Sequence, residues 1–447
     1  MRKVMEMSKE IQELARTTEV LLECDVVVIG GGPAGMAAAV GAAKAGANTI
    51  IVERYSCLGG NITISSVEPP SWYRQENTTM PGGVQKEIED RMIALNAVTP
   101  VNMKPSTGLS YDTEIFKYMA DCYIKDYGIT PVYHCLGTSP YMVGNQVKGV
   151  ITESKSGRRA ILAKRVVDCT GDADLVYRSG APCLKGDPVT GELQPGTLKF
   201  FASNVDIEKV DALMDSDPGC RDPLIHKLLY QPFQRAVEAG EPPLENSYNR
   251  IFYTPIPPDE LNINLGTYDR QLDGTDVLSL TASEIKLRRE VLEVLRRLRK
   301  YGDGFENARL RNYAMAVGVR ETRRIVGSYT LTFDDIFKRA RFEDTIGVFP
   351  VYADGEHIKE IPYTDAYFQV PFRILHPQGV DNLLTAGRCI SCERAAVPTT
   401  REMDFCMVTG QAAGAASALS IRQNVTSKQV DIHSLQQELV RQGLRVF

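Results

Sequence analysis

The sequence predicts an α/β fold in which a parallel sheet carries the main domain, together with a second, α+β domain. The first observation is segment 24–29, CDVVVI, an apolar and β-branched run that leads directly into a glycine-rich turn. The second is that small, helix-compatible residues follow over 33–45, and a further strand pattern, NTIIV, occupies 48–52. Strand, helix and strand in this order are typical of a βαβ unit with parallel strands. The third is the length, because 447 residues exceed one ordinary domain and predict two.

The elements around this unit follow from local patterns. A short amphipathic helix is expected over 10–16, and the irregular segment 65–104 contains a helix at about 85–95. Asp112 is expected to cap a helix that runs to residue 126, and a strand is expected over 130–136. From residue 142 the chain alternates apolar and polar residues, with turn signals at 144–145 and 156–157. This pattern predicts a β-meander that returns to the main sheet at 165–168.

The second domain is predicted from a change of character between residues 191 and 377, where long charged helices such as 282–301 accompany mixed strands. A last sheet strand after Val380 and a terminal helix over 399–419 then return to the first domain. The expected division is a discontinuous Rossmann-like domain at 20–66, 105–190 and 378–425, a cap domain at 67–104 and 191–377, an N-terminal helix in 1–19 and a C-terminal tail helix in 426–447.

The composition excludes several classes of protein. With 43% hydrophobic residues, 24% charged residues and a formal net charge of -5, the chain has the composition of a soluble globular protein and does not favour nucleic-acid binding. The first residues lack the apolar run of a signal peptide, and no apolar stretch reaches the roughly 18 residues that a membrane helix needs. We therefore expect a cytoplasmic protein without membrane contact, and a homo-oligomer is left open.

Ten cysteines are scattered along the chain, which indicates reduced, mostly buried thiols rather than a disulfide framework. The one close pair, Cys389 and Cys392, has the spacing C-x2-C. A second pair, of the kind that zinc and iron–sulfur sites use, is missing. No metal site is predicted, and the role of this pair stays open.

A glycine motif at the first turn points to a bound dinucleotide. Gly30, Gly32 and Gly35 form G-x-G-x-x-G between the first strand and helix, and Glu53 ends the second strand. The first glycine permits the tight turn, the second lets the pyrophosphate approach the backbone, and the third lets helix and strand pack closely. The helix N-terminus then faces the phosphates, and Glu53 accepts from ribose hydroxyls. The expected contacts are Gly30, Gly32, Pro33, Ala34, Gly35 and Glu53.

Three further segments favour a flavin over a nicotinamide cofactor. Residues 53–61 contain a second glycine pair, 168–174 contain a Thr-Gly-Asp turn after a strand, and 385–388 are Thr-Ala-Gly-Arg. A nicotinamide cofactor needs only the first motif, whereas a buried flavin uses elements from both ends of the chain. The additional expected FAD contacts are Arg54, Gly59, Gly60, Asn61, Gly171, Asp172, Gly387 and Arg388.

Five motifs resemble those of the FAD-dependent oxidoreductase family, within the glutathione-reductase-type two-domain flavoproteins. They are VVVIGGGPAGMAAA, VERYSCLGGN, VVDCTGDADL, GVRETRRIVG, and NLLTAGRCIS followed by TREMDFCMVTGQAAGAA, and the resemblance covers about residues 19–419. It implies noncovalent FAD, redox chemistry at its ring, and a terminal helix whose N-terminus points at the flavin. Gly410 and Gly414 in this helix are interpreted as packing residues.

The chain departs from that group in three places. Cys57 stands alone where disulfide reductases carry two redox cysteines, so a flavin–disulfide relay is not expected. No second G-x-G-x-x-G occurs, so a separate NAD(P)H domain of that type is not expected. Arg388 stands where related flavoproteins often place an acid near the ribityl chain.

Substrate binding is expected to depend on arginines, because guanidinium groups bind carboxylates bidentately and neutralise charge beside a hydride-transfer centre. Arg320 and Arg324 belong to GVRETRR, and Arg394 and Arg401 precede the terminal helix. The four are expected to form one cluster over the flavin ring. The alternative is that each is paired with a neighbouring glutamate and serves the structure.

Other side chains are candidates if the arginines are structural. His376 and Tyr363 are candidate proton donors or acceptors, and Trp72 is the only tryptophan, whereas His134 is interpreted as structural.

The predicted function is an FAD-dependent oxidoreductase, of dehydrogenase or ene-reductase type, that moves a hydride between FAD and a small organic substrate bearing a carboxylate or carbonyl. The alternative is the flavin subunit of a larger complex that passes electrons to a protein partner. A flavin monooxygenase is a weaker third interpretation, because it needs a site for NAD(P)H that the sequence does not reveal.

Overall fold

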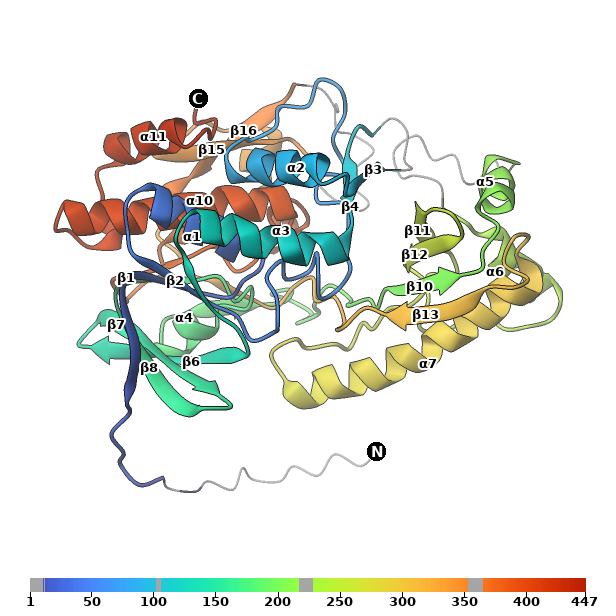
Figure 1. Cartoon of the computed structure of the whole chain (residues 1–447), viewed down its shortest axis with the longest axis horizontal. Helices are drawn as coiled ribbons and strands as arrows, with labels where there is room; N and C mark the ends of the chain where they lie inside the picture. The colour runs from blue at the N-terminus through green and yellow to red at the C-terminus, as the bar shows by residue number, and fades with distance from the viewer. Residues whose placement is uncertain (1–10, 12, 102–105, 217–227, 353–364) are drawn as a thin grey trace.

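The computed structural model describes residues 11, 13–101, 106–216, 228–352 and 365–447. Figure 1 shows two lobes: the larger contains a seven-stranded sheet with helices packed on it, and the smaller contains a four-stranded sheet beside the long helix α7, Val277–Tyr301. The α/β fold class predicted from the sequence is confirmed.

The main sheet has the strand order β5, β2, β1, β8, β7, β6, and β17 also pairs with β8. β1 is parallel to both β2 and β8, with Val28 opposite Ile51 and Val167. β6, β7 and β8 are consecutive antiparallel strands, so the predicted meander is confirmed. The strands are β1 Val20–Ile29, β2 Thr49–Val52, β5 Thr130–Val132, β6 Cys135–Val143, β7 Gln146–Ser154, β8 Gly157–Asp168 and β17 Leu383–Thr385.

Two helices from opposite ends of the chain, α1 Pro33–Lys44 and α10 Met403–Arg422, pack against each other over this sheet (Figure 1). A Cβ atom at Gly410 would lie 2.1 Å from the carbonyl oxygen of Ala34, and one at Gly414 would lie 1.9 Å from that of Ala38. Only glycine permits so close an approach of two backbones. The interpretation of these glycines as packing residues is confirmed.

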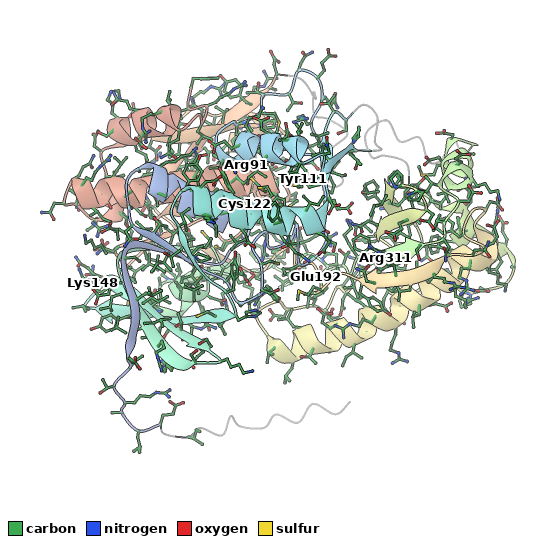
Figure 2. The ribbon with its side chains drawn as sticks, viewed as in Figure 1. Arg91, Tyr111, Cys122, Lys148, Glu192 and Arg311 are labelled. Carbon is green, nitrogen blue, oxygen red and sulfur yellow. The ribbon has the colours of Figure 1, made fainter. Side chains whose placement is uncertain are left out.

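α2, Val84–Ala94, and α3, Thr113–Asp126, complete the same layer. The Asp112 carboxylate accepts hydrogen bonds from two N–H groups of the first turn of α3, at 2.9 and 3.0 Å, and is therefore the predicted N-cap. Arg91 of α2 forms an ion pair with the last residue of α3 at 2.8 Å. Figure 2 labels Arg91 on α2 and Cys122 on the neighbouring α3.

The smaller lobe, called the cap below, is an antiparallel sheet in the order β11, β12, β10, β13. Its core is separate from the larger one, and Phe200, Ile263 and Leu298 are completely buried in it. α7 begins at Val277 rather than at residue 282, because Asp276 caps it. The other elements are α5 Ile207–Ser216, α6 Gln231–Glu238, β10 Phe200–Ser203, β11 Phe252–Ile256, β12 Glu260–Asn264 and β13 Arg309–Tyr313.

Two segments that the sequence grouped with the cap pack into the larger core. Val84, Ile88 and Met92 of α2 are completely buried among residues of α1 and α10. β15, Thr345–Pro350, pairs with β16, Tyr367–Pro371, and both strands contribute to the same core. The buried cores therefore group these parts of 67–104 and 191–377 with the main sheet.

Three local expectations need correction. Residue 11 and residues 13–19 have no regular structure, and the rest of the predicted N-terminal helix lies outside the described residues. The strand expected over 130–136 is divided into β5 and β6, because His134 between them has a φ of 53°. The terminal helix is divided into α9, Val397–Thr400, and α10, because Glu402 between them is extended with ψ 139°.

The tail contains one helix, as expected, over a shorter range than 426–447. The remaining elements are β3 Val98–Pro100, β4 Leu109–Tyr111, α4 Asp174–Arg178, β9 Cys183–Lys185, β14 Arg323–Ile325, α8 Phe333–Phe337, α11 Ile432–Arg441 and the 3-10 turns Phe372–Leu375, Arg394–Ala396 and Ser427–Gln429.

Candidate functional site

A first cavity lies at the carboxyl ends of β1, β8 and β17, beside the N-terminus of α1. It has a volume of about 1180 Å³, part of it open to solvent, and Ile29, Cys169 and Ala386 line it where those strands end. Ligands of open parallel α/β sheets bind at this edge.

The glycine motif shapes one end of this cavity. Gly30 has a φ of +99°, and a Cβ atom there would lie 2.4 Å from the carbonyl oxygen of Cys169. A Cβ atom at Gly35 would lie 1.7 Å from the carbonyl oxygen of Gly30, so helix and strand are in direct contact. Gly32 differs, because the nearest atom to its Cβ position is the Gly60 Cα at 3.8 Å. Gly32, Pro33 and Ala34 line the cavity, which leaves room for phosphates at the helix N-terminus.

Glu53 lies at the next position along the cavity, at the end of β2. Its carboxylate accepts hydrogen bonds from the N–H groups of Gly31 at 2.6 Å and Tyr55 at 2.9 Å. Each carboxylate oxygen keeps further acceptor capacity, so the group can also accept from a ribose hydroxyl. Glu53 is buried and oriented before any ligand binds.

The segment after β2 divides into lining and supporting residues. Arg54, Gly60 and Asn61 line the first cavity. Gly59 does not, and its role is local: it has a φ of +108° and its N–H donates to the carbonyl oxygen of Gly31 at 2.8 Å. Close approach at Gly60 is required too, because a Cβ atom there would lie 2.7 Å from Gly32 Cα.

The Thr-Gly-Asp turn meets Arg388 on the far side of the cavity. Asp172 accepts from Arg388 Nη2 at 3.1 Å and from the Thr322 hydroxyl at 2.7 Å. Gly171 has a φ of +78°, and a Cβ atom there would lie 2.6 Å from Arg388 Nη2. Arg388 Nη1 is buried and has no hydrogen-bond partner among the described residues.

An unsatisfied buried guanidinium nitrogen calls for a ligand acceptor. Gly387 and Arg388 both line the cavity, so this surface fits a cofactor with polar oxygens. The glycine cradle, the preoriented Glu53 and the free donor on Arg388 together fit FAD.

A second cavity, with a volume of about 1130 Å³ that is partly open to solvent, lies between the main sheet and the cap. It meets the first cavity at five residues that line both, namely Asn61, Val319, Arg388, Arg401 and Met403. Its other walls include Trp72, Lys199, Phe252 and Arg320. A molecule in the second cavity would therefore contact one in the first.

The four predicted substrate arginines do not form one cluster. Arg320 and Arg401 line the second cavity, as expected of substrate residues. Arg324 lines neither cavity and is buried, with Nη1 2.6 Å from Glu321. Arg394 lines neither cavity and lies 3.7 Å from Asp187 and 3.5 Å from Glu321. The structural alternative therefore describes Arg324 and Arg394.

The other residues proposed from the sequence also differ in whether they line a cavity. Trp72 lines the second cavity, whereas Tyr363 lies outside the described residues. His376 lines neither cavity, and burial, with a smaller effect of Lys428, lowers its pKa to about 3. It is neutral at pH 7 and packs edge-on against Phe372, which indicates a structural role.

The cysteines of the described residues are free thiols. Cys57, Cys389 and Cys392 are free and buried, and none of them lines either cavity. Cys392 Sγ contacts the Thr400 hydroxyl at 3.5 Å, and Cys389 Sγ contacts the Ala386 carbonyl at 3.6 Å. Among the described residues, no cluster of His, Cys, Asp or Glu could hold a metal ion.

One residue of the second cavity was not expected from the sequence. Lys199 is buried at the start of β10, and burial lowers its pKa to about 8, with Glu68 opposing the shift. The available signal was a single lysine inside the apolar run 198–202, LKFFA. Such a lysine is expensive to bury and is therefore a candidate functional residue.

Comparisons with known proteins agree with a flavoenzyme. Residues 25–439 match the family model described as FAD dependent oxidoreductase. A 74-residue segment is 36% identical to urocanate reductase of Eggerthella lenta, covering 16% of this chain and 12% of that protein. A 53-residue segment is 49% identical to NADH oxidase of Thermoanaerobacter brockii, covering 11% and 8%. The chain thus spans about a tenth of the length of these relatives.

Solved structures are similar at low identity. A geranylgeranyl bacteriochlorophyll reductase-like protein of Thermoplasma acidophilum is 14% identical with a TM-score of 0.48, over 94% of this chain and 83% of that one. The myxobacterial chondrochloren halogenase is 11% identical with a TM-score of 0.49, over 94% and 79%. No helix among the described residues is long and apolar enough to cross a bilayer. Because the family model matches nearly the whole chain, this protein belongs to the FAD dependent oxidoreductase family.

Proposed function

We propose that the protein transfers a hydride between FAD in the first cavity and a small organic substrate in the second. The observation that carries this proposal is that the two cavities meet at shared residues, among them Arg388 and Arg401. FAD supplies hydride-accepting or hydride-donating chemistry at its ring. The chain must then bind the substrate beside that ring, neutralise its charge and exclude water.

Arginines are suited to hold the substrate. Arg401 lies where the cavities meet and Arg320 lines the second cavity, so a carboxylate or carbonyl between them would be held by charge-assisted hydrogen bonds. Met403, the first residue of α10, lines both cavities, so the helix N-terminus faces the same space. Its partial positive charge stabilises negative charge there by about 0.3–2 kcal/mol.

The type of flavoprotein and the direction of hydride transfer are also part of this proposal. The motif order supports a two-domain flavoprotein of the glutathione-reductase type. The lone Cys57 and the missing second G-x-G-x-x-G favour a variant of that type that works without a redox disulfide and without a separate NAD(P)H domain. A dehydrogenase and an ene-reductase both use the arrangement, since the direction depends on the substrate. A second cavity shared between two lobes favours a small molecule over a protein as the reaction partner.

The test is anaerobic spectroscopy of the FAD-loaded protein. Oxidised protein is mixed with a panel of carboxylic acids and alcohols, and dithionite-reduced protein is mixed with enoates. At least one compound should bleach, or restore, the visible flavin band. If no compound of the panel does so while a redox protein exchanges electrons with the flavin rapidly, the electron-transfer subunit is the correct function.

A further inference from the structure

Lys199 differs from the other cations of the second cavity. It is 2% exposed and lines that cavity, and no hydrogen bond or close ion pair holds its ammonium group among the described residues. The buried Glu68 carboxylate acts on it electrostatically but only partly offsets the effect of burial on its pKa. Arg388, by contrast, is paired with Asp172 at 3.1 Å, and Arg320 donates to the Pro195 carbonyl at 2.6 Å. A buried ammonium without an acceptor carries a large desolvation cost.

The position of Lys199 is fixed by the cap sheet. It directly precedes Phe200, which pairs with Ile263 on β12, so it lies beside Asn264. Asn264 in turn pairs with Phe252 on β11, and Phe252, Asn264 and Lys199 all line the cavity. The cap thus contributes a wall with an aromatic ring, an amide and an ammonium group, held by backbone pairing.

The other wall comes from the larger lobe and is also cationic. Arg388 and Arg401 lie where the two cavities meet, whereas Lys199 lines only the second. Glu402 is the single acidic residue of the lining, against four basic ones. Positive charge on both walls of one cavity favours a ligand with two negative charges.

The apolar side chains of the second cavity indicate what lies between the two charged groups of the ligand. Trp72 and Phe252 are aromatic, and Val67, Leu228 and Leu265 are aliphatic. A single ammonium group matches the single charge of a carboxylate, whereas a phosphate monoester carries about -1.5 to -2 at pH 7 and calls for more donors. We propose that the second cavity binds a dicarboxylate with a planar apolar body, one carboxylate held by Arg401 beside the flavin and the other by Lys199 on the cap.

This inference rests on the proposed function, because it specifies the substrate class of the same site. The test is therefore direct binding to the oxidised, FAD-loaded protein rather than turnover. Trp72 is the only tryptophan of the chain and lines the cavity, so its fluorescence reports occupancy there, and calorimetry supplies an independent affinity.

The probes are matched pairs: phenylsuccinate against 3-phenylpropionate, and terephthalate against benzoate, each pair differing by one carboxylate. The diacid of at least one pair should bind about tenfold or more tightly than its monoacid, as expected for one additional charge-assisted contact. Lys199→Met should remove this difference and leave the monoacid affinity unchanged. Lys199→Arg should retain it, and Lys155→Met, in the exposed turn between β7 and β8, should behave as wild type.

Three outcomes overturn the inference: equal affinity for diacids and monoacids, an unchanged preference in Lys199→Met, or no diacid binding at millimolar concentration. The experiments distinguish a failure of the dicarboxylate class from a failure of the proposed function. If a monocarboxylate reduces or reoxidises the flavin while diacids do not bind, hydride transfer stands and the dicarboxylate class is wrong.

Discussion

Replacing Gly32 with valine tests whether the first cavity holds the cofactor phosphates. Gly32 has φ -71° and ψ -174°, an extended conformation that valine adopts readily, and its Cβ position is 3.8 Å from the nearest atom. The apoprotein should therefore fold normally, with the new side chain in the cavity. Loss of one charge-assisted bond to a phosphate costs about 1.5–3 kcal/mol, which weakens FAD binding about 10- to 150-fold.

Gly35→Ala is the matched control, because its Cβ would lie 1.7 Å from the carbonyl oxygen of Gly30. That clash requires a backbone shift costing about 1–3 kcal/mol, so the apoprotein itself should melt earlier. The assays are flavin-fluorescence titration of apoprotein and thermal melting without FAD. Wild-type FAD affinity in Gly32→Val, or an apoprotein melting point as low as that of Gly35→Ala, would refute the assignment.

Three further predictions concern the substrate side. Arg401→Ala should slow flavin reduction by substrate about 10- to 100-fold with an unchanged flavin spectrum, whereas Arg394→Ala, outside both cavities, should have little effect in the same stopped-flow assay. Cys57→Ser should keep the rate within about tenfold, or 1.4 kcal/mol of barrier, because Cys57 lines neither cavity; a larger loss would indicate a redox thiol. Dicarboxylate affinity, measured by calorimetry across pH, should be constant between about pH 6 and pH 8, where both ligand carboxylates are ionised. Above pH 8 it should fall toward the monoacid affinity, because burial lowers the pKa of Lys199 to about 8 and only its charged form attracts the second carboxylate. In Lys199→Arg the affinity should stay constant through pH 10, since arginine remains charged, and an identical fall would assign the titration to another group.

The main sheet could be predicted because its signals are local. The run before Gly30, the small residues of α1 and the alternation over β7 and β8 each specify one element, and the parallel pairing follows from the βαβ order. The cap could be predicted only as mixed helices and strands. Its sheet pairs β10 with β12 and β13, which lie far apart in sequence, and no local pattern specifies such pairing.

Most residues that line the first cavity belong to short motifs, so the sequence alone could propose them as cofactor contacts. The lining of the second cavity could not be proposed in this way. The apolar run around Lys199 indicates a buried lysine, but its place in a cavity between two lobes is evident only from the structure. The four arginines looked equivalent in sequence, because burial and ion pairing with Glu321 or Asp187 depend on which direction each side chain takes.

In the segment GVRETRR, neighbouring residues have different positions: one lines a cavity and another is buried in an ion pair. Arg320 lines the second cavity, while Arg324, four residues later, is buried with its guanidinium 2.6 Å from Glu321. Between them, the Thr322 hydroxyl donates to Asp172 at 2.7 Å, and Asp172 accepts from Arg388. One short segment therefore fixes a residue of the second cavity and, through Asp172, the arginine that lies where the two cavities meet. Both cavities therefore depend on this segment, although its two arginines play different roles.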